Sequence, residues 1–277
     1  MRVTVLMENT APSGLECEHG LSLYIEHNHR RYLLDAGSSH HMVENATKLG
    51  VTLSEVDAAV LSHGHYDHAG GFIAFFHENA AAPLYLRREA TQPSYAKTGP
   101  LKHYIGIPKS LRDYTDRLHF VEGPLELDDG VWLLPHDTPG LSQRGKAAHM
   151  YRKTPAGKID DDFAHEHSLI FLTDEGMILF SSCSHAGADT VVEEALRRFP
   201  DQPVRAFLGG FHLMGMTGVS TLGVPPAEVE ALGRRLLELG VTEIWTGHCT
   251  GKPGFDLLRP VLGARLNYLS TGTVLEF

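Results

Sequence analysis

The stretch LSHGHYDHAGG, residues 61–71, constrains this chain more than any other feature. It places three histidines and one aspartate within six positions, and imidazole and carboxylate groups are the ligands that proteins use to hold transition metals. It follows Ala58–Leu61, a short apolar run that predicts a buried strand. Ligand sites in α/β sheets lie beyond the carboxyl ends of strands, so we interpret the stretch as a metal-binding loop.

The spacing of this loop favours two metal ions over one. His63, His65 and Asp67 alternate, so neighbours in that series can converge on one point, whereas His68 must point elsewhere. We therefore expect His63 and His65 on a first ion and Asp67 and His68 on a second. The glycines of the loop allow the backbone to bend tightly around the ions.

Three further histidines, His185, His212 and His248, each follow a short apolar strand within a few residues. We expect His185 to complete the first metal site and His248 the second. His212 is then left without a metal, where its imidazole could act as a general acid or bind a phosphate, with plain packing as the alternative. The candidate catalytic residues are accordingly Asp67 and His212.

The amino-acid composition limits the classes of molecule that this protein is expected to bind. Lys and Arg total 24 against 34 Asp and Glu, a net charge of -10 that argues against nucleic acid or an anionic membrane but allows a small anionic substrate at a metal. Three widely spaced cysteines without a CxxC pair predict no disulfide framework, and we expect no signal peptide and no membrane-spanning segment. We expect a cytoplasmic protein with a small-molecule substrate, and the sequence leaves its oligomeric state open.

Short apolar strands alternate with helical stretches, and this pattern occurs twice along the chain. Two similar halves packed face to face predict an α/β fold, a four-layer αββα sandwich, in one domain over residues 1–277. Residues 89–119 show no clear periodicity and predict an irregular, cap-like insertion, with a poorly ordered insertion as the alternative. Its basic residues would favour an anionic substrate; they are Lys97, Lys102, His103, Lys109 and Arg112.

The motif HGHYDH resembles the signature of the metallo-β-lactamase fold superfamily. A narrower resemblance covers nearly the whole chain, and it is to the branch of 7,8-dihydropterin-6-methyl-4-(β-D-ribofuranosyl)-aminobenzene-5'-phosphate synthase-like proteins. This resemblance implies a metallo-β-lactamase fold with two divalent metal ions, zinc in the first place and manganese or iron as alternatives. The motifs that carry it are, in order, EHGLS (18–22), LLDAG (33–37), LSHGHYDHAGG (61–71), HEHSL (165–169), CSHAG (183–187), GGFHL (209–213) and GHCTG (247–251).

Two features depart from the pattern of the superfamily. Its hydrolases usually carry a metal-bridging aspartate where this chain has Cys183, so either hydroxide or substrate alone bridges the ions or Cys183 supplies a thiolate; a small buried cysteine is the alternative. His165 precedes its strand as the third histidine of the superfamily does. We favour His185 as the ligand and assign His165 and Glu166 to a pair beside the metals or facing the substrate.

Residues near the N-terminus supply candidate supporting groups. Glu18 and His19 could orient a metal-binding histidine through its second ring nitrogen. Asp35, at the end of the LLDAG strand, could do the same or cap the following helix. Lys102 joins these residues as a candidate contact for the substrate.

The function that these observations predict is that of a dinuclear metal-dependent hydrolase, which uses a metal-bound hydroxide on a small anionic or phosphorylated substrate. One alternative is a dihydropterin-type synthase that condenses a pterin pyrophosphate with a ribofuranosyl-aminobenzene phosphate. A second alternative is not an enzyme but an iron-binding redox or ligand-sensing protein.

Overall fold

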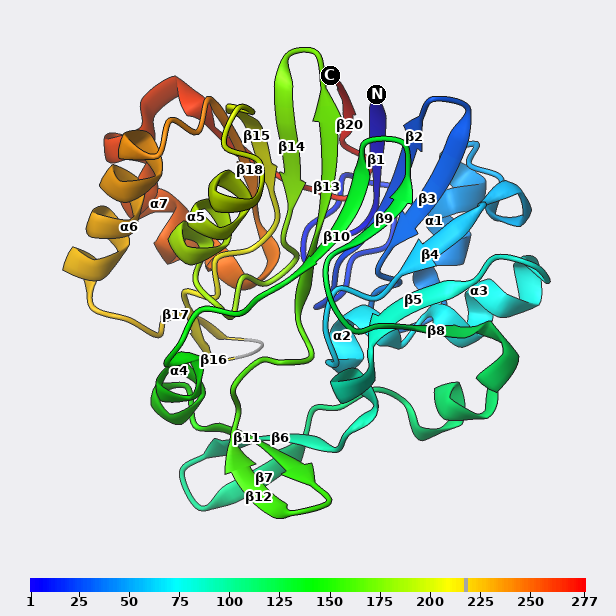
Figure 1. Ribbon diagram of the computed structural model, residues 1–277, viewed down its shortest axis with the longest axis horizontal. Coiled ribbons are helices and arrows are strands. Elements are labelled where there is room, and N and C mark those ends of the chain that lie inside the picture. Colours follow the sequence, from blue (N-terminus) through cyan, green and yellow to red (C-terminus); the bar gives the residue numbers. More distant parts are fainter. Residues whose placement is uncertain (217–218) are drawn as a thin grey trace. The chain divides into compact units, whose positions relative to one another are not determined.

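The computed structural model describes residues 1–216 and 219–277 (Figure 1). The chain divides into two compact units, each built around its own sheet. The first unit comprises Met1–Glu122, Gly140–Glu166 and Ser270–Phe277, and the second comprises Gly123–Pro139 and His167–Leu269. The prediction of a single domain stays a prediction.

A seven-stranded mixed sheet forms the centre of the first unit, in the order β20-β1-β2-β3-β4-β5-β8. The strands from β3 to β8 are parallel, whereas β20, β1, β2 and β3 pair antiparallel. The bounds are β1 (Arg2–Met7), β2 (Ser22–His27), β3 (Arg30–Leu34), β4 (Ala58–Val60), β5 (Leu84–Arg87), β8 (Leu118–Val121) and β20 (Val274–Glu276).

Short helices cover this sheet and complete its core. Leu33 and Leu84 of the strands belong to the same buried cluster as Met42 of α1 and Phe72 and Phe75 of α3. The helices are α1 (His41–Lys48), α2 (Tyr66–Ala69) and α3 (Phe72–Glu78), with 3-10 turns η1 (Leu53–Glu55), η2 (Arg88–Thr91), η3 (Lys109–Asp113) and η4 (Thr115–Arg117). The short α2 carries part of the HGHYDH motif, so the motif lies between β4 and α3 in the chain.

A second, four-stranded sheet in the first unit runs in the order β12-β11-β6-β7. The expectation of an irregular segment over residues 89–119 is wrong for residues 94–104, which form two strands of this sheet. Tyrosine and lysine alternate with small side chains in β6, and β7 reads Leu-Lys-His-Tyr, so no apolar periodicity marks either strand. The bounds are β6 (Ser94–Thr98), β7 (Leu101–Tyr104), β11 (Met150–Thr154) and β12 (Gly157–Asp160), and α4 (Leu141–Ala147) precedes β11.

The second unit is built on a seven-stranded sheet in the order β19-β18-β15-β14-β13-β10-β9. Strands β14, β15, β18 and β19 are parallel, which brings their carboxyl ends to one edge. The bounds are β9 (Leu125–Asp128), β10 (Val131–Pro135), β13 (His167–Thr173), β14 (Gly176–Phe180), β15 (Val204–Leu208), β18 (Glu243–Thr246) and β19 (Leu266–Tyr268), with the small pair β16 (Met214–Met216) and β17 (Val219–Leu222).

Three helices, α5 (Ala188–Arg198), α6 (Pro226–Glu238) and α7 (Gly251–Leu262), pack in series beside this sheet (Figure 1). Helix α7 contains two glycines and two prolines, which are poor helix formers, so the sequence did not predict it. Burial of Phe255, Leu258 and Leu262 on one face stabilises it despite these residues. The short turns η5 (His248–Thr250) and η6 (Gly263–Arg265) flank α7. No helix in the described part of the chain combines the length and apolarity needed to cross a bilayer.

Candidate metal centre

The HGHYDH motif follows β4, as the sequence predicted, and its last residues lie in the short helix α2, which the sequence did not predict. His63, His65, Asp67 and His68 are all buried. The glycines that follow the motif allow the backbone to pack closely against its neighbours as well as to bend. A Cβ atom on Gly70 would lie 1.9 Å from the carbonyl oxygen of Ser38 and could not be accommodated. The loop is thus locked against its neighbours.

Two histidines of the loop are oriented by a shared network around Asp35. The Nδ1 atom of His68 donates to Oδ2 of Asp35 at 2.7 Å. Ser62 donates its hydroxyl to the same carboxylate at 2.7 Å, so its Oγ accepts from Nδ1 of His63 at 2.8 Å. Because both histidines use Nδ1 in this network, Nε2 is the nitrogen that each can offer to a metal ion. Of the two roles considered for Asp35, the structure places it in contact with His68.

His65 is held in its neutral form by its surroundings. Burial, with a smaller contribution from the nearby imidazole of His165, lowers the pKa of His65 to about 3. Neutral imidazole is the form that ligates metals, so His65 need not lose a proton to bind a metal near neutral pH.

His165 contacts this loop through its ring. Its Nδ1 atom accepts from the backbone N–H of Gly64 at 3.1 Å, and its Nε2 atom lies 3.2 Å from Oδ2 of Asp161. Both ring nitrogens are therefore engaged, and His165 has no lone pair left to offer a metal in this arrangement. Glu166, its predicted companion, is also buried.

The two N-terminal candidates occupy different places. His19 reaches the loop, with Nε2 3.1 Å from Oδ2 of Asp67. Glu18 instead accepts hydrogen bonds from the backbone N–H groups of Ser38 and Ser39 at 2.8 and 2.9 Å. Its carboxylate organises the turn before α1, whereas Asp35 and Ser62 contact the loop histidines.

The donor set of the first unit fits a divalent transition ion. The loop offers three imidazoles and one carboxylate, from His63, His65, His68 and Asp67, and all four side chains are buried. Asp67 lies 3.7 Å from Nε2 of His68. Imidazole nitrogens with a carboxylate suit zinc, manganese, iron or cobalt.

In the second unit, three loops gather at the edge where parallel strands β14, β15 and β18 end. They carry His185, His212 and His248, and the ring centroids of His185 and His212 are 4.2 Å apart. His212 and His248 both have φ of +48°, and Ser184 has φ of +52°. Left-handed backbone at non-glycine residues is strained and clusters at functional sites.

Both cysteines of this unit lie in the same loops and are buried without a disulfide. The thiol of Cys249 approaches the carbonyl oxygen of Cys183 at 3.6 Å, and the backbone N–H of His212 donates to its sulfur at 3.3 Å. Burial opposes ionisation of Cys249, but hydrogen bonds from Cys183 and His212 bring its pKa well below the usual value. Metal ligation by Cys183 stays a prediction.

A cluster that the sequence reasoning missed lies beside α5 in the second unit. His136 directly follows β10, and its Nδ1 atom lies 2.6 Å from Oε2 of Glu194 while Nε2 lies 3.3 Å from Oγ of Ser168. The signal was available, because His136 follows an apolar strand as the other histidines do. Lys102, by contrast, is an exposed residue of β7.

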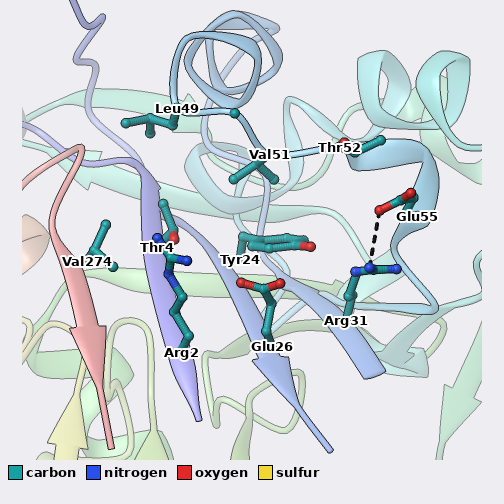
Figure 2. A pocket seen from close by; sticks show the side chains of 11 residues that line it. Arg2, Thr4, Tyr24, Glu26, Arg31, Leu49, Val51, Thr52, Glu55 and Val274 are labelled. Atoms are coloured by element: carbon teal, nitrogen blue, oxygen red, sulfur yellow. Dashed lines mark ion pairs between the residues drawn. The ribbon is translucent and has the colours of Figure 1, made fainter. Parts of the chain in front are cut away.

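A pocket of about 180 Å³ lies elsewhere on the first unit, between the β1–β2–β3 region and the loop after α1 (Figure 2). Its lining holds no histidine or cysteine, and its charges are balanced. Arg31 pairs with Glu55 at 3.3 Å, and Glu26 stands opposite both Arg2 and Arg31 in the sheet. The pocket therefore lacks the donor set of the metal loop.

Comparison with known proteins identifies relatives of this chain. The family model of the metallo-β-lactamase superfamily matches residues 15–150 of this chain. The metal-dependent hydrolase Tm1679 of the β-lactamase superfamily is 28% identical, covers 100% of this chain and 99% of its own, and superposes with a TM-score of 0.83. The fold is accordingly the metallo-β-lactamase fold.

A curated relative points to a narrower branch. The 7,8-dihydropterin-6-methyl-4-(β-D-ribofuranosyl)-aminobenzene-5'-phosphate synthase of Methanocaldococcus jannaschii is 27% identical over an alignment of 282 positions, which covers 94% of this chain and 90% of that protein. Zn²⁺-bound PqqB from Methylobacterium extorquens, 14% identical with a TM-score of 0.58 over all of both chains, is a likeness of fold alone.

Proposed function

We propose that this protein is a metal-dependent hydrolase that acts on a small anionic substrate with two divalent metal ions. The proposed ligands are His63, His65, Asp67, His68, His185 and His248. The observation that carries the proposal is the buried network in which Asp35 and Ser62 fix the Nδ1 atoms of His68 and His63. When bound, the ions polarise the substrate and lower the pKa of a water molecule toward neutrality.

The remaining steps fall to side chains of the chain itself. Asp67 is the candidate base for the attacking water, and its carboxylate is steadied by His19 at 3.1 Å. His212 is the candidate acid for the leaving group, and its ring centroid lies 4.2 Å from that of the proposed ligand His185. Burial of the loop histidines keeps bulk water away from the reacting groups.

The proposed substrate class is supported by the lysine–tyrosine face, defined as one face of the four-stranded sheet. In the strand register, Lys97 stands directly opposite Lys102, and Lys153 directly opposite Lys158. Like charges directly opposite each other destabilise a sheet, so their presence favours a role in binding an anion. The face consists of Tyr95, Lys97, Lys102, Tyr104, Tyr151, Lys153 and Lys158, together with the acidic Asp160.

The lysines of this face converge over a pair of stacked rings. The rings of Tyr95 and Tyr151 are 5.3 Å apart and nearly parallel. The ammonium group of Lys102 lies 4.3 Å from the centre of Tyr95, and that of Lys158 lies 4.0 Å from the centre of Tyr151. In the described part of the chain, neither lysine forms an ion pair with a carboxylate. This concentration of cations in an acidic chain supports an anionic or phosphorylated substrate.

The test combines metal analysis of the purified protein with a panel of phosphodiester, phosphomonoester and lactone substrates. The protein should carry divalent metal and cleave at least one class of ester. His63→Ala should abolish cleavage with the fold retained, whereas His77→Ala, which removes an exposed histidine of α3, should not. Full activity in His63→Ala, or a purified protein that binds no divalent metal, would refute the proposal.

A second candidate function is condensation, favoured by the name of the archaeal relative. Such an enzyme would join a dihydropterin diphosphate to a ribofuranosyl-aminobenzene phosphate and release diphosphate. Incubation with both compounds separates the two functions. Formation of the condensed product supports the synthase, and simple hydrolysis of the diphosphate supports the hydrolase.

A further inference from the structure

Three side chains of the first unit form a buried chain of hydrogen bonds that ends on the metal loop. Arg152 of β11 donates from Nε to Oδ1 of Asp161 at 3.0 Å. Oδ2 of Asp161 contacts Nε2 of His165 at 3.2 Å, and Nδ1 of His165 accepts from the N–H of Gly64 at 3.1 Å. Arg152, Asp161 and His165 are each at most 2% exposed. We call these three residues the relay.

The hydrogen bonds fix the tautomer of His165. A backbone N–H can only donate, so Nδ1 of His165 must carry a lone pair where it meets Gly64. The proton of the neutral ring is therefore on Nε2, which donates it to Asp161. The carboxylate is held in turn, because Oδ1 also accepts from the N–H of Phe163 at 2.9 Å.

The end point of the relay is the residue between two proposed metal ligands. Gly64 separates His63 from His65, and the ring of His165 lies 5.1 Å from that of His65. On its other side, Gly64 packs against the backbone of Ala90, where an added Cβ would come within 2.8 Å. Gly64 is thus clamped between His165 and Ala90, and its position sets the direction in which both ligands leave the loop.

We propose that Arg152, Asp161 and His165 are positioning residues that hold the His63–His65 segment in its metal-binding conformation. This inference rests on the proposed function for the identity of the ligands. It assigns to the four-stranded sheet, through Arg152, a direct connection to the metal loop. A buried ion pair is weak evidence for stability alone, since apolar residues of similar volume often stabilise as well. A positioning role explains why these three residues are polar, because apolar residues could not hold Gly64 through hydrogen bonds.

The substitution Asp161→Asn tests the positioning role, because it changes the hydrogen bonds of this side chain and keeps its volume. Two N–H donors face the Oδ1 position, so the amide oxygen must occupy it and the amide NH₂ must face His165. Nε2 of His165 then has to accept, which moves its proton to Nδ1, opposite the N–H of Gly64. Two donors would meet there, and the bond to Gly64 would be lost.

The experiment measures the tautomer and the metal affinity in the same protein. In metal-free wild type, ¹⁵N NMR of the imidazole should show a protonated Nε2 and an unprotonated Nδ1 in His165, with the Gly64 amide protected from exchange. Asp161→Asn should reverse the two nitrogen signals, remove the protection and weaken zinc binding by roughly 10- to 100-fold. His165→Gln, whose amide can accept from Gly64 and donate to Asp161, should retain most of the affinity.

Glu194→Gln is the matched control, because it removes another buried carboxylate that contacts a histidine, His136. It should leave zinc affinity at the wild-type value. The inference is overturned if Asp161→Asn folds and binds zinc as tightly as wild type, or if His165→Gln loses as much affinity as Asp161→Asn. If wild type binds no metal, the proposed function fails, and the nitrogen signals and Gly64 protection still decide whether the relay exists.

Discussion

Oδ2 of Asp35 lies 2.7 Å from Nδ1 of His68, and both side chains are completely buried. Asp35 has a φ of +59°, a left-handed conformation that costs free energy in an aspartate. The strand β3 thus ends in a strained residue whose carboxylate is turned into the metal loop. A strained buried carboxylate with this contact is typical of the group that orients a metal-ligating histidine.

Asp35→Asn should weaken metal binding. The amide keeps the volume of the carboxylate but removes its charge, so His68 becomes a poorer ligand. We expect a loss in zinc affinity of roughly 10- to 100-fold, measured by competition with a chelating dye. Asp57→Asn is the control, because Asp57 contacts Arg30 and the N–H of Arg31 in the same unit, away from the loop. Equal zinc affinity in both variants would contradict the assignment.

Removal of two lysines from the lysine–tyrosine face should weaken substrate binding without changing the chemical step. For Lys102→Ala with Lys158→Ala, we expect KM for a phosphorylated substrate to rise roughly 5- to 10-fold with kcat nearly unchanged, because exposed charges each contribute up to about 1 kcal/mol. Lys48→Ala with Lys252→Ala removes the same charge from outside the face. If this control raises KM equally, the effect is one of net charge and the face has no special role.

His212→Asn should lower kcat and leave metal binding intact. Asparagine tolerates the left-handed backbone of this position, so the loop should keep its shape. Loss of a general acid typically costs about 10²- to 10⁴-fold in rate. A substrate with a leaving group that needs no protonation should be cleaved at nearly the wild-type rate, and an equal loss on that substrate would argue against proton donation by His212.

Glu194 should make folding stability depend on acid pH. Burial raises its pKa, but hydrogen bonds from His136 and Thr138 outweigh burial and bring the value down to about 2 from the usual 4.5. Because the folded state binds this proton more weakly than the unfolded state, the stabilisation is fully present above pH 4.5 and is lost as the pH falls toward 2.

The measurement is urea unfolding of wild type and Glu194→Gln at pH 5 and pH 3. The advantage of wild type over the variant should shrink by about 2 kcal/mol between these two pH values. A difference that is constant with pH would show that Glu194 has the same pKa in the folded and unfolded chain.

The sequence by itself determined the local features of this protein. The apolar run before His63 predicted the strand β4, and the alternation of His63, His65 and Asp67 marked the candidate metal-binding loop. Apolar runs likewise placed the loops of His185, His212 and His248 at strand ends. These features are readable because burial of a strand and ligation of a metal both depend on residue type at short spacing.

Only the tertiary structure decided which distant groups support the loop. Glu18 and Asp35 were both candidates to orient a histidine, and the contact to His68 belongs to Asp35 because β3 ends beside β4. Strands β6 and β7 escaped the sequence because their pattern is polar, and their partner β11 is about fifty residues away in the chain. The residues next to a carboxylate or a lysine in the sequence do not show which group its side chain will contact. Its partner is set by strand register and loop closure, which depend on the whole packed unit.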